Sequence, residues 1–217
     1  MREHGFKRLL RHTAGAGFSG LARLVTGVRP VWQGAAPSGR QRIFFANHAS
    51  HGDFILLSAC LPPSERYRTR PVAAADYWEK TPLRRFVATE LFDCVLVERE
   101  AGARASDPMA AMLDALDGGS SLIIFPEGTR NTGTEPLPFR SGLYNLATAR
   151  PHVELVPAFI ENMSRVLPKG EFLPVPLLCR VVFGEAVKPE KGEERRAFLD
   201  RAREALLALD PRREAGP

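Results

Sequence analysis

A histidine and a carboxylate stand close together in the chain, directly after an apolar run. His48 and Asp53 are five residues apart, and residues 43–46 before them are apolar. Histidine ordinarily has a pKa near neutrality, so it can accept a proton at physiological pH, and a carboxylate on its far ring nitrogen holds one tautomer for that role. A sharp turn over residues 50–52 would bring Asp53 back to His48, and Gly52 makes such a turn inexpensive in backbone strain. We therefore predict a general-base pair where a strand ends.

A second polar stretch follows another apolar run. Residues 122–124 are apolar, and Glu127, Gly128, Thr129 and Arg130 come shortly after them. A planar guanidinium can make two parallel hydrogen bonds to an oxyanion, so this stretch favours a phosphate site. Ordinary turn chemistry after a strand is the alternative interpretation. Both stretches are typical of strand ends that open into loops, which is where open α/β sheets bind their ligands.

Two other interpretations compete for the first stretch. Ser50 and Asp53 also form a capping-box pattern before the apolar residues 54–57, a structural role that is compatible with the catalytic one. His48, His51 and Asp53 could belong to a metal site, but such a site needs further ligands. The sequence has only three other histidines and no C-x-x-C motif, so we expect no metal and expect His51 to be a loop or surface residue. The sequence also lacks a G-x-S-x-G motif, which favours direct attack by a substrate hydroxyl over a covalent intermediate.

Apolar runs and helix signals alternate along the chain, which predicts an α/β sheet with helices on its faces. The length of 217 residues fits one such domain. Three scattered cysteines are too few for a disulfide framework, so we expect a reducing compartment. No run of 18 apolar residues occurs, so no transmembrane helix is expected. Gly15, Gly17, Gly20 and Arg23 interrupt the apolar residues near the N-terminus, so no signal peptide is expected either. The predicted strands are 42–46, 71–75, 93–98, 121–125, 153–160 and 176–183, and the predicted helices are 53–61, 76–91, 107–117, 141–149 and 193–209.

Positive charge is concentrated near the N-terminus. Residues 1–40 carry seven basic side chains and one acidic one, while the whole chain has a net charge of +5. A helix over residues 5–28 would separate an apolar stripe from basic residues, which favours contact with an anionic membrane surface. Packing of the stripe on the domain is the alternative. No nucleic-acid-binding motif accompanies the basic residues, so no nucleic-acid partner is expected. The stripe consists of Phe6, Leu10, Ala14, Leu21, Leu24, Val25 and Val28.

The two polar stretches together resemble the glycerolipid acyltransferase family. Asn47–Asp53 fits the family pattern N-H-x-S-x-x-D, and Phe125–Arg130 fits F-P-E-G-T-R, both without a mismatch. Val95–Arg99, Phe139–Gly142 and Val153–Ala158 look like further blocks of the same family. The likeness runs from about residue 42 to residue 184.

The resemblance implies an O-acyltransferase of the 1-acylglycerol-3-phosphate type. Its fold would be a mixed, largely parallel sheet flanked by helices, with an N-terminal amphipathic helical arm. It implies transfer of a fatty acyl group from acyl-CoA or acyl carrier protein to lysophosphatidate, giving phosphatidate, without a metal or organic cofactor. The alternatives are another acceptor (glycerol 3-phosphate, another lysophospholipid or a lyso-aminolipid) or a non-catalytic, membrane-associated lipid-binding protein.

The resemblance also implies roles for individual residues. His48 would be the base and Asp53 the acid that orients it. The expected substrate-binding residues are Arg99, Glu127, Gly128, Thr129 and Arg130, and the expected supporting residues are Asn47, Ser50 and Arg140.

These inferences divide the chain into three parts. We expect a basic amphipathic, membrane-associating arm at 1–40, an acyltransferase domain at 41–210 and a frayed tail at 211–217. Arginine outnumbers lysine 25 to 5, which is typical of a GC-rich bacterial gene. The expected location is peripheral or monotopic, at the cytoplasmic face of a bacterial inner membrane.

Overall fold

The computed structural model describes residues 2–98, 107–131, 133, 135–161 and 179–214. Its strands are β1 (Arg29–Trp32), β2 (Arg42–Ala46), β3 (Thr69–Ala74), β4 (Val95–Val97), β5 (Ser121–Ile124), β6 (Glu154–Glu161) and β7 (Arg180–Phe183). They form one seven-stranded sheet in the order β1-β7-β6-β2-β5-β3-β4. Every neighbouring pair is parallel except β6 and β7. The prediction of a mixed, largely parallel sheet is confirmed.

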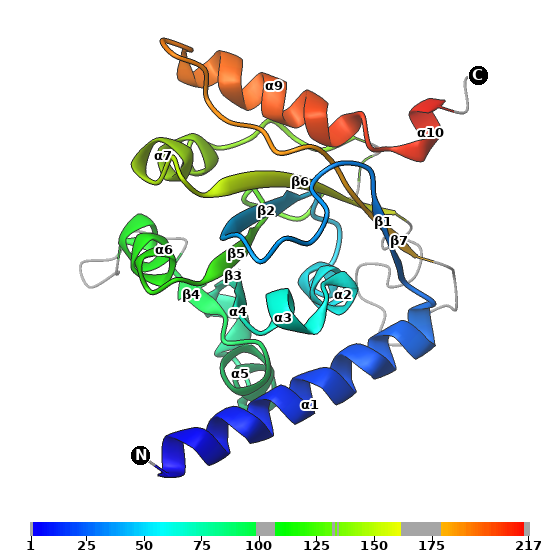
Figure 1. Ribbon diagram of the computed structural model, residues 1–217, viewed down its shortest axis with the longest axis vertical. Coiled ribbons are helices and arrows are strands. Elements are labelled where there is room, and N and C mark those ends of the chain that lie inside the picture. The colour runs from blue at the N-terminus through cyan, green and yellow to red at the C-terminus, as the bar shows by residue number, and fades with distance from the viewer. Residues whose placement is uncertain (1, 99–106, 132, 134, 162–178, 215–217) are drawn as a thin grey trace.

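Helices cover both faces of this sheet, as Figure 1 shows. Phe44 and Phe45 on the central strand β2 point to opposite faces, because side chains alternate along a strand, and each enters a different core cluster. Phe44 shares one cluster with Phe54 and Leu57 and meets the Phe183 ring, and Phe45 shares the other with Phe198 and meets the Phe139 ring. The helices are α1 (Arg2–Thr26), α2 (Asp53–Cys60), α3 (Pro63–Arg66), α4 (Ala75–Trp78), α5 (Pro82–Phe86), the π-helical turn η1 (Val87–Leu91), α6 (Pro108–Asp117), α7 (Gly142–Ala149), α9 (Arg195–Leu207) and α10 (Pro211–Glu214).

The long helix predicted at 76–91 is wrong, because it is broken into α4, α5 and η1. The break falls at Thr81, whose backbone is extended (φ −136°, ψ 150°) and whose hydroxyl accepts from the N–H of Arg84. The residue before a proline disfavours the helical conformation, so Pro82 starts a new helix instead of continuing the old one.

Three short elements were not predicted. The strand β1, which lies within the expected arm, pairs with β7 along its whole length. It is an edge strand, where the missing N–H of Pro30 costs no hydrogen bond to a second neighbour. The turn α3 was missed, and so was α10, which occupies part of the segment expected to be frayed. The part of the predicted strand 176–183 before residue 179 lies outside the described residues.

The helix α1 packs against the domain through small and aromatic residues. Gly15 and Ser19 are buried, and Phe18 and Ala22 pack against the core, where the Phe18 ring meets Phe92 edge-on at 5.7 Å. The expected apolar stripe points elsewhere over the part of α1 whose side chains are described. The stripe residues Leu21, Leu24 and Val25 are exposed, whereas Val28 after the helix is buried.

Candidate active site

The imidazole of His48 and the carboxylate of Asp53 form a close pair. His48 follows β2, and Asp53 is the first residue of α2, whose N-cap is Gly52. The His48 Nδ1 atom lies 2.9 Å from Oδ2 of Asp53. The Asp53 carboxylate is fully buried and stands at a helix N-terminus, where the helix dipole favours a negative charge. The turn expected from the sequence therefore brings these two side chains together.

The hydrogen bonds around Asp53 fix the tautomer of His48. The backbone N–H groups of Ala49 and Ser50 both donate to Oδ2, at 2.7 and 2.9 Å. Because Oδ2 acts as an acceptor in both bonds, Nδ1 of His48 is the donor in the third. The other ring nitrogen, Nε2, then carries the lone pair that a base needs. Only half of the expected capping box forms. The Ser50 N–H donates to Asp53, but the Ser50 hydroxyl accepts from the N–H of Gly52, at 3.3 Å, instead of from the N–H of Asp53.

The carboxylate of Glu127 holds the backbone of His48. It is buried, at 3% exposure, and its Oε1 accepts from the His48 N–H at 2.8 Å while Oε2 accepts from the Leu137 N–H at 2.8 Å. The carbonyl of His48 accepts from the N–H of Asn131 at 2.7 Å. Both backbone groups of His48 are therefore bonded to the loop that follows β5, and both oxygens of Glu127 are bonded to backbone rather than turned to an open site.

Two further neighbours fix the position of the His48 loop. The Phe125 ring stacks on the imidazole, with centroids 4.2 Å apart and planes inclined by 19°. Asn47 exchanges two hydrogen bonds with the backbone of Ile160 on β6, at 2.7 and 3.0 Å. Sequence reasoning missed the stacking of Phe125 and the contact of Asn131. The only sequence signal for the stacking was that Phe125 is the first residue of the second motif.

The loop after β5 also presents cations. Gly128 has φ +69°, and a Cβ built there would lie 2.5 Å from Nε of Arg140, so the Arg140 side chain crosses directly over this glycine. Thr129 and Arg140 are exposed and Arg130 is half-buried. Within the described ranges no carboxylate pairs with Arg130 or Arg140. These guanidinium groups are therefore available to an anion brought next to His48.

Comparison with known proteins identifies this arrangement. The model of the acyltransferase family matches residues 29–161, more than half of the chain, and includes both polar stretches. The chain belongs to the acyltransferase family. The expectation drawn from the two motifs is confirmed at this level.

Relatives of this acyltransferase include 1-acyl-sn-glycerol-3-phosphate acyltransferases. One from Limnanthes douglasii is 26% identical over 169 residues, which is 74% of this chain and 56% of the relative. One from Chlamydomonas reinhardtii is 29% identical over 99 residues, 45% of this chain and 29% of the relative. The chain thus spans 56% of the length of one of these curated relatives and 29% of the other.

A solved structure has a similar fold. The crystal structure of the 1-acyl-sn-glycerophosphate acyltransferase from Thermotoga maritima superimposes with a TM-score of 0.75, at 21% identity, over 98% of this chain and 84% of that one. The likeness supports the overall arrangement of sheet and helices in this acyltransferase.

Two residues considered in the sequence analysis remain, the predicted substrate-binding residue Arg99 and the loop histidine His51. Arg99 lies outside the described residues. The half-buried His51 stacks on Tyr77, with centroids 3.4 Å apart. Over the part of the chain that is described, no group of three or more His, Cys, Asp or Glu side chains could hold a metal ion.

Proposed function

We propose that this acyltransferase moves a fatty acyl group from a thioester donor, acyl-CoA or acyl carrier protein, to the free hydroxyl of lysophosphatidate. The product would be phosphatidate. The observation that carries the proposal is the His48–Asp53 pair, with Nε2 of His48 as its base, beside the loop after β5, whose Arg130 and Arg140 have no carboxylate partner among the described residues. The names of the relatives from Limnanthes and Chlamydomonas support the same acceptor.

The proposed step needs no covalent enzyme intermediate. His48 Nε2 removes the proton of the acceptor hydroxyl while the oxygen forms a bond to the thioester carbonyl carbon. The C–S bond then breaks, and the leaving thiolate takes the proton back from the imidazolium. Asp53 stabilises the imidazolium between these two steps, as the carboxylate of a catalytic triad does. Arg130, with Arg140, would bind the phosphate of the acceptor and so place its hydroxyl at Nε2.

Turnover of oleoyl-CoA and lysophosphatidate by the purified protein tests this proposal. Loss of a general base lowers rates by about 10²–10⁴, and we expect His48→Ala to lower kcat by that factor. His152→Ala, which changes an exposed histidine, is the matched control and should keep the parent rate. Full turnover by His48→Ala would contradict the role of His48. Lipid binding without turnover on a panel of lysolipids, read by mass spectrometry, would favour a non-catalytic lipid-binding protein.

We also propose that the outer face of α1 contacts an anionic membrane surface. None of the described helices is long and apolar enough to cross a membrane. Leu21 and Leu24 are 56% and 83% exposed, although the same helix packs on the domain through its other side. Leu83 and Phe86, at 72% and 52%, add exposed apolar surface on α5. The helix α5 runs directly into η1, whose Leu91 carbonyl lies against Gly15 of α1. Burial of such residues in a lipid interface gains free energy in proportion to the apolar area removed from water.

Co-sedimentation with phosphatidylglycerol vesicles tests the membrane contact. Deleting α1 would expose the core beneath Phe18, so the sharper variant is Leu21→Ser with Leu24→Ser, which leaves the packing face intact. We expect at least tenfold weaker vesicle binding with an unchanged melting temperature. Phosphatidylcholine vesicles serve as the neutral-lipid control. Equal binding by the parent and the double variant would place the membrane contact elsewhere.

A further inference from the structure

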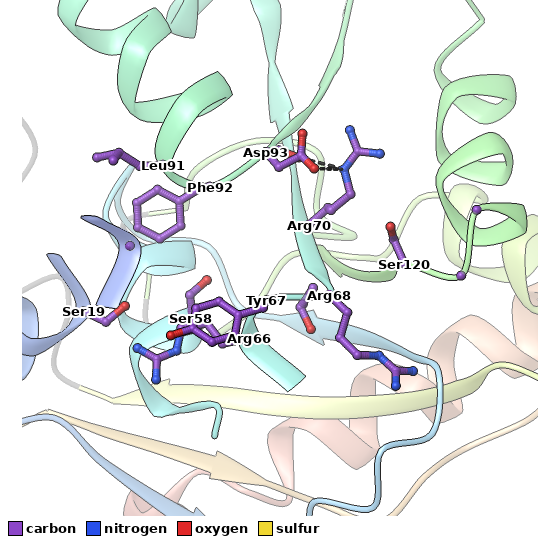
Figure 2. Close-up of a pocket in the computed structure, with 14 residues that line it drawn as sticks. Ser19, Ser58, Arg66, Tyr67, Arg68, Arg70, Leu91, Phe92, Asp93 and Ser120 are labelled. Atoms are coloured by element: carbon purple, nitrogen blue, oxygen red, sulfur yellow. Dashed lines mark hydrogen bonds and ion pairs between the residues drawn. The ribbon is translucent and has the colours of Figure 1, made fainter. Parts of the chain in front are cut away.

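A cavity lies at the end of the sheet opposite His48. It has a volume of about 310 Å³, and its wall includes Thr69, where β3 begins, and Ser120, just before β5. His48 instead follows the last residue of the parallel strand β2. At about 3.3 Å per residue, the four residues of β5 alone separate the two ends by about 13 Å. This cavity is therefore distinct from the candidate active site (Figure 2).

Three buried polar atoms of the cavity wall have no hydrogen-bond partner. They are Oγ of Ser19 on α1, Oγ of Ser58 on α2 and Nε of Arg66 on α3. Ser19 is 1% exposed and Ser58 is 2% exposed. Buried polar groups in proteins are almost always bonded, so these three atoms are suited to bond a polar group that enters the cavity. In the view of Figure 2 these three side chains gather on one side of the cavity.

The cavity also carries uncompensated positive charge. Across the described ranges, no carboxylate forms an ion pair with Arg66 or with Arg68, which also lines the wall. Burial lowers the pKa of the Arg66 guanidinium below its usual value. The positive charge of Arg23 also lowers this pKa, whereas Tyr67 raises it. A cation that is partly desolvated and close to another cation is stabilised by a bound anion.

Glu65, which precedes Arg66 in the chain, and Asp93, on the cavity wall, have other partners, although Oε2 of Glu65 has none. Oε1 of Glu65 accepts from the N–H groups of Ser38 and Gly39 and lies 3.6 Å from Arg42. Asp93, also on the cavity wall, pairs with Arg70 at 3.3 Å. Neither carboxylate therefore neutralises Arg66.

We propose that this cavity binds a phosphate group. The bound phosphate would link α1 to α2 and α3 by accepting hydrogen bonds from Ser19, Ser58 and Arg66. A guanidinium and hydroxyl groups are suitable donors to phosphate oxygens, and here they come from three different helices. Small-molecule sites in proteins have volumes of about 300–1,000 Å³, so the cavity could hold a phosphate with a small organic group attached. The phosphate belongs either to the headgroup of a phospholipid or to a soluble compound. This binding is independent of the chemistry at His48.

Calorimetric titration of the full chain tests the site. The parent for this test is the double variant Arg130→Ala with Arg140→Ala, which removes both proposed acceptor-phosphate contacts, so that failure of the proposed acyl transfer does not affect the result. The probes are inorganic phosphate and monomeric dihexanoyl phosphatidylglycerol. We expect one saturable site that Arg66→Gln weakens at least tenfold and Ser58→Ala weakens severalfold. Arg195→Gln, an exposed arginine on α9, is the matched control and should bind as the parent does.

The two probes distinguish the sources of the phosphate. At least tenfold tighter binding of the lipid supports a headgroup, and equal binding supports a soluble phosphate. Saturating probe should also slow tryptic cleavage within α1 severalfold in the parent and not in Arg66→Gln. No saturable binding of either probe, binding that is indifferent to both Arg66→Gln and Ser58→Ala, or cleavage of α1 that the probe does not slow would each overturn the proposal.

Discussion

The backbone N–H of His48 donates to Oε1 of Glu127 over 2.8 Å, although 79 residues separate them in the chain. The second oxygen of the same carboxylate bonds Leu137. The resemblance assigned Glu127 to the acceptor, but this geometry connects it to the loop that carries the base. A role in positioning His48 and a role in binding acceptor predict different kinetics.

Replacement of Glu127 by glutamine should lower kcat much more than it raises KM for the acceptor. An amide NH2 cannot accept a hydrogen bond, so either His48 or Leu137 loses its partner. A buried donor without a partner costs about 1–3 kcal/mol, and about 1.4 kcal/mol corresponds to a factor of ten in rate. Steady-state kinetics against lysophosphatidate measures both constants. A raised KM at constant kcat would instead support direct contact with the acceptor.

Replacement of Asp53 by asparagine should abolish most of the activity without unfolding the protein. Asparagine keeps an oxygen that can accept the bonds from Ala49 and Ser50, but it cannot stabilise an imidazolium by charge. We expect kcat to fall by about 10²–10⁴. Asp200→Asn, on the exposed surface of α9, is the control. Activity close to that of the parent would show that Asp53 only holds the turn before α2.

The close approach of Arg140 to Gly128 makes this glycine sensitive to substitution. A side chain there meets both an unfavourable φ of +69° and the Arg140 guanidinium, so Gly128→Ala should displace Arg140 and raise KM for the acceptor severalfold. Gly142→Ala, with open space around the added carbon, should leave KM unchanged. An Arg140→Ala change in the Gly128→Ala background should add little further loss. Full additivity of the two changes would show that the residues act separately.

Lysine should be a poor substitute for Arg130. A guanidinium can contact phosphate with two parallel hydrogen bonds, whereas an ammonium is a point charge. The expected signature of Arg130→Lys is a raised KM for lysophosphatidate with a smaller change in kcat, because the contact is made in the ground state and the transition state alike. An equal loss on a phosphate-free acceptor analogue would contradict a phosphate contact.

A buried ion network at the start of β2 should make stability depend on pH. Arg42 is 3% exposed, and its Nε donates to Glu154 at 3.0 Å. Burial works against ionisation of Glu154, but the hydrogen bonds from Arg40 and Arg42 outweigh it and lower its pKa. An acid with a lowered pKa stabilises the folded state fully above its unfolded pKa, about 4.3, and progressively less as the pH falls through the folded value.

Melting curves between pH 6 and pH 3 measure this dependence. The melting temperature of the parent should fall below about pH 4.3. Glu154→Gln should have a lower melting temperature at pH 6 but a smaller decrease between pH 6 and pH 3. Arg42→Met leaves the buried carboxylate of Glu65 without its guanidinium partner at 3.6 Å and removes one of the two arginines that bond Glu154. It should cost about 3–5 kcal/mol at neutral pH. Parallel pH profiles for the parent and Glu154→Gln would contradict the role of this carboxylate.

Patterns that depend on neighbouring residues were predictable from the sequence. The strands β2, β5 and β6 follow from their apolar runs, and the pairing of His48 with Asp53 follows from a turn within one short segment. The two motifs also predicted the family. The break of the helix at Thr81 was predictable in principle from Pro82, and the apolar residues on both sides of it concealed that signal.

Features that depend on distant pairing were not predictable. The bonds of Glu127 require β2 and β5 to be neighbours in register, which no local pattern encodes. Periodicity located an apolar stripe on α1, but the side that packs is the one with Gly15, Ser19 and Ala22. Hydrophobicity alone does not tell which face of a helix has a complementary surface to meet.

The strand order has a consequence for the way this chain reaches its native state. β2 pairs with β5 and β6, and β1 pairs with β7. The strands β1 and β2 therefore cannot pair until partners much later in the chain have been synthesised. Such non-local pairing slows folding, because loop closure precedes the gain from contacts. When synthesis has reached residue 100, His48 and Asp53 have been made, but β5 and β6, the two strands that flank β2, have not. The nascent chain therefore carries β2, all five residues of which are buried in the fold, unpaired for much of its synthesis, and an exposed strand of this kind is prone to aggregation.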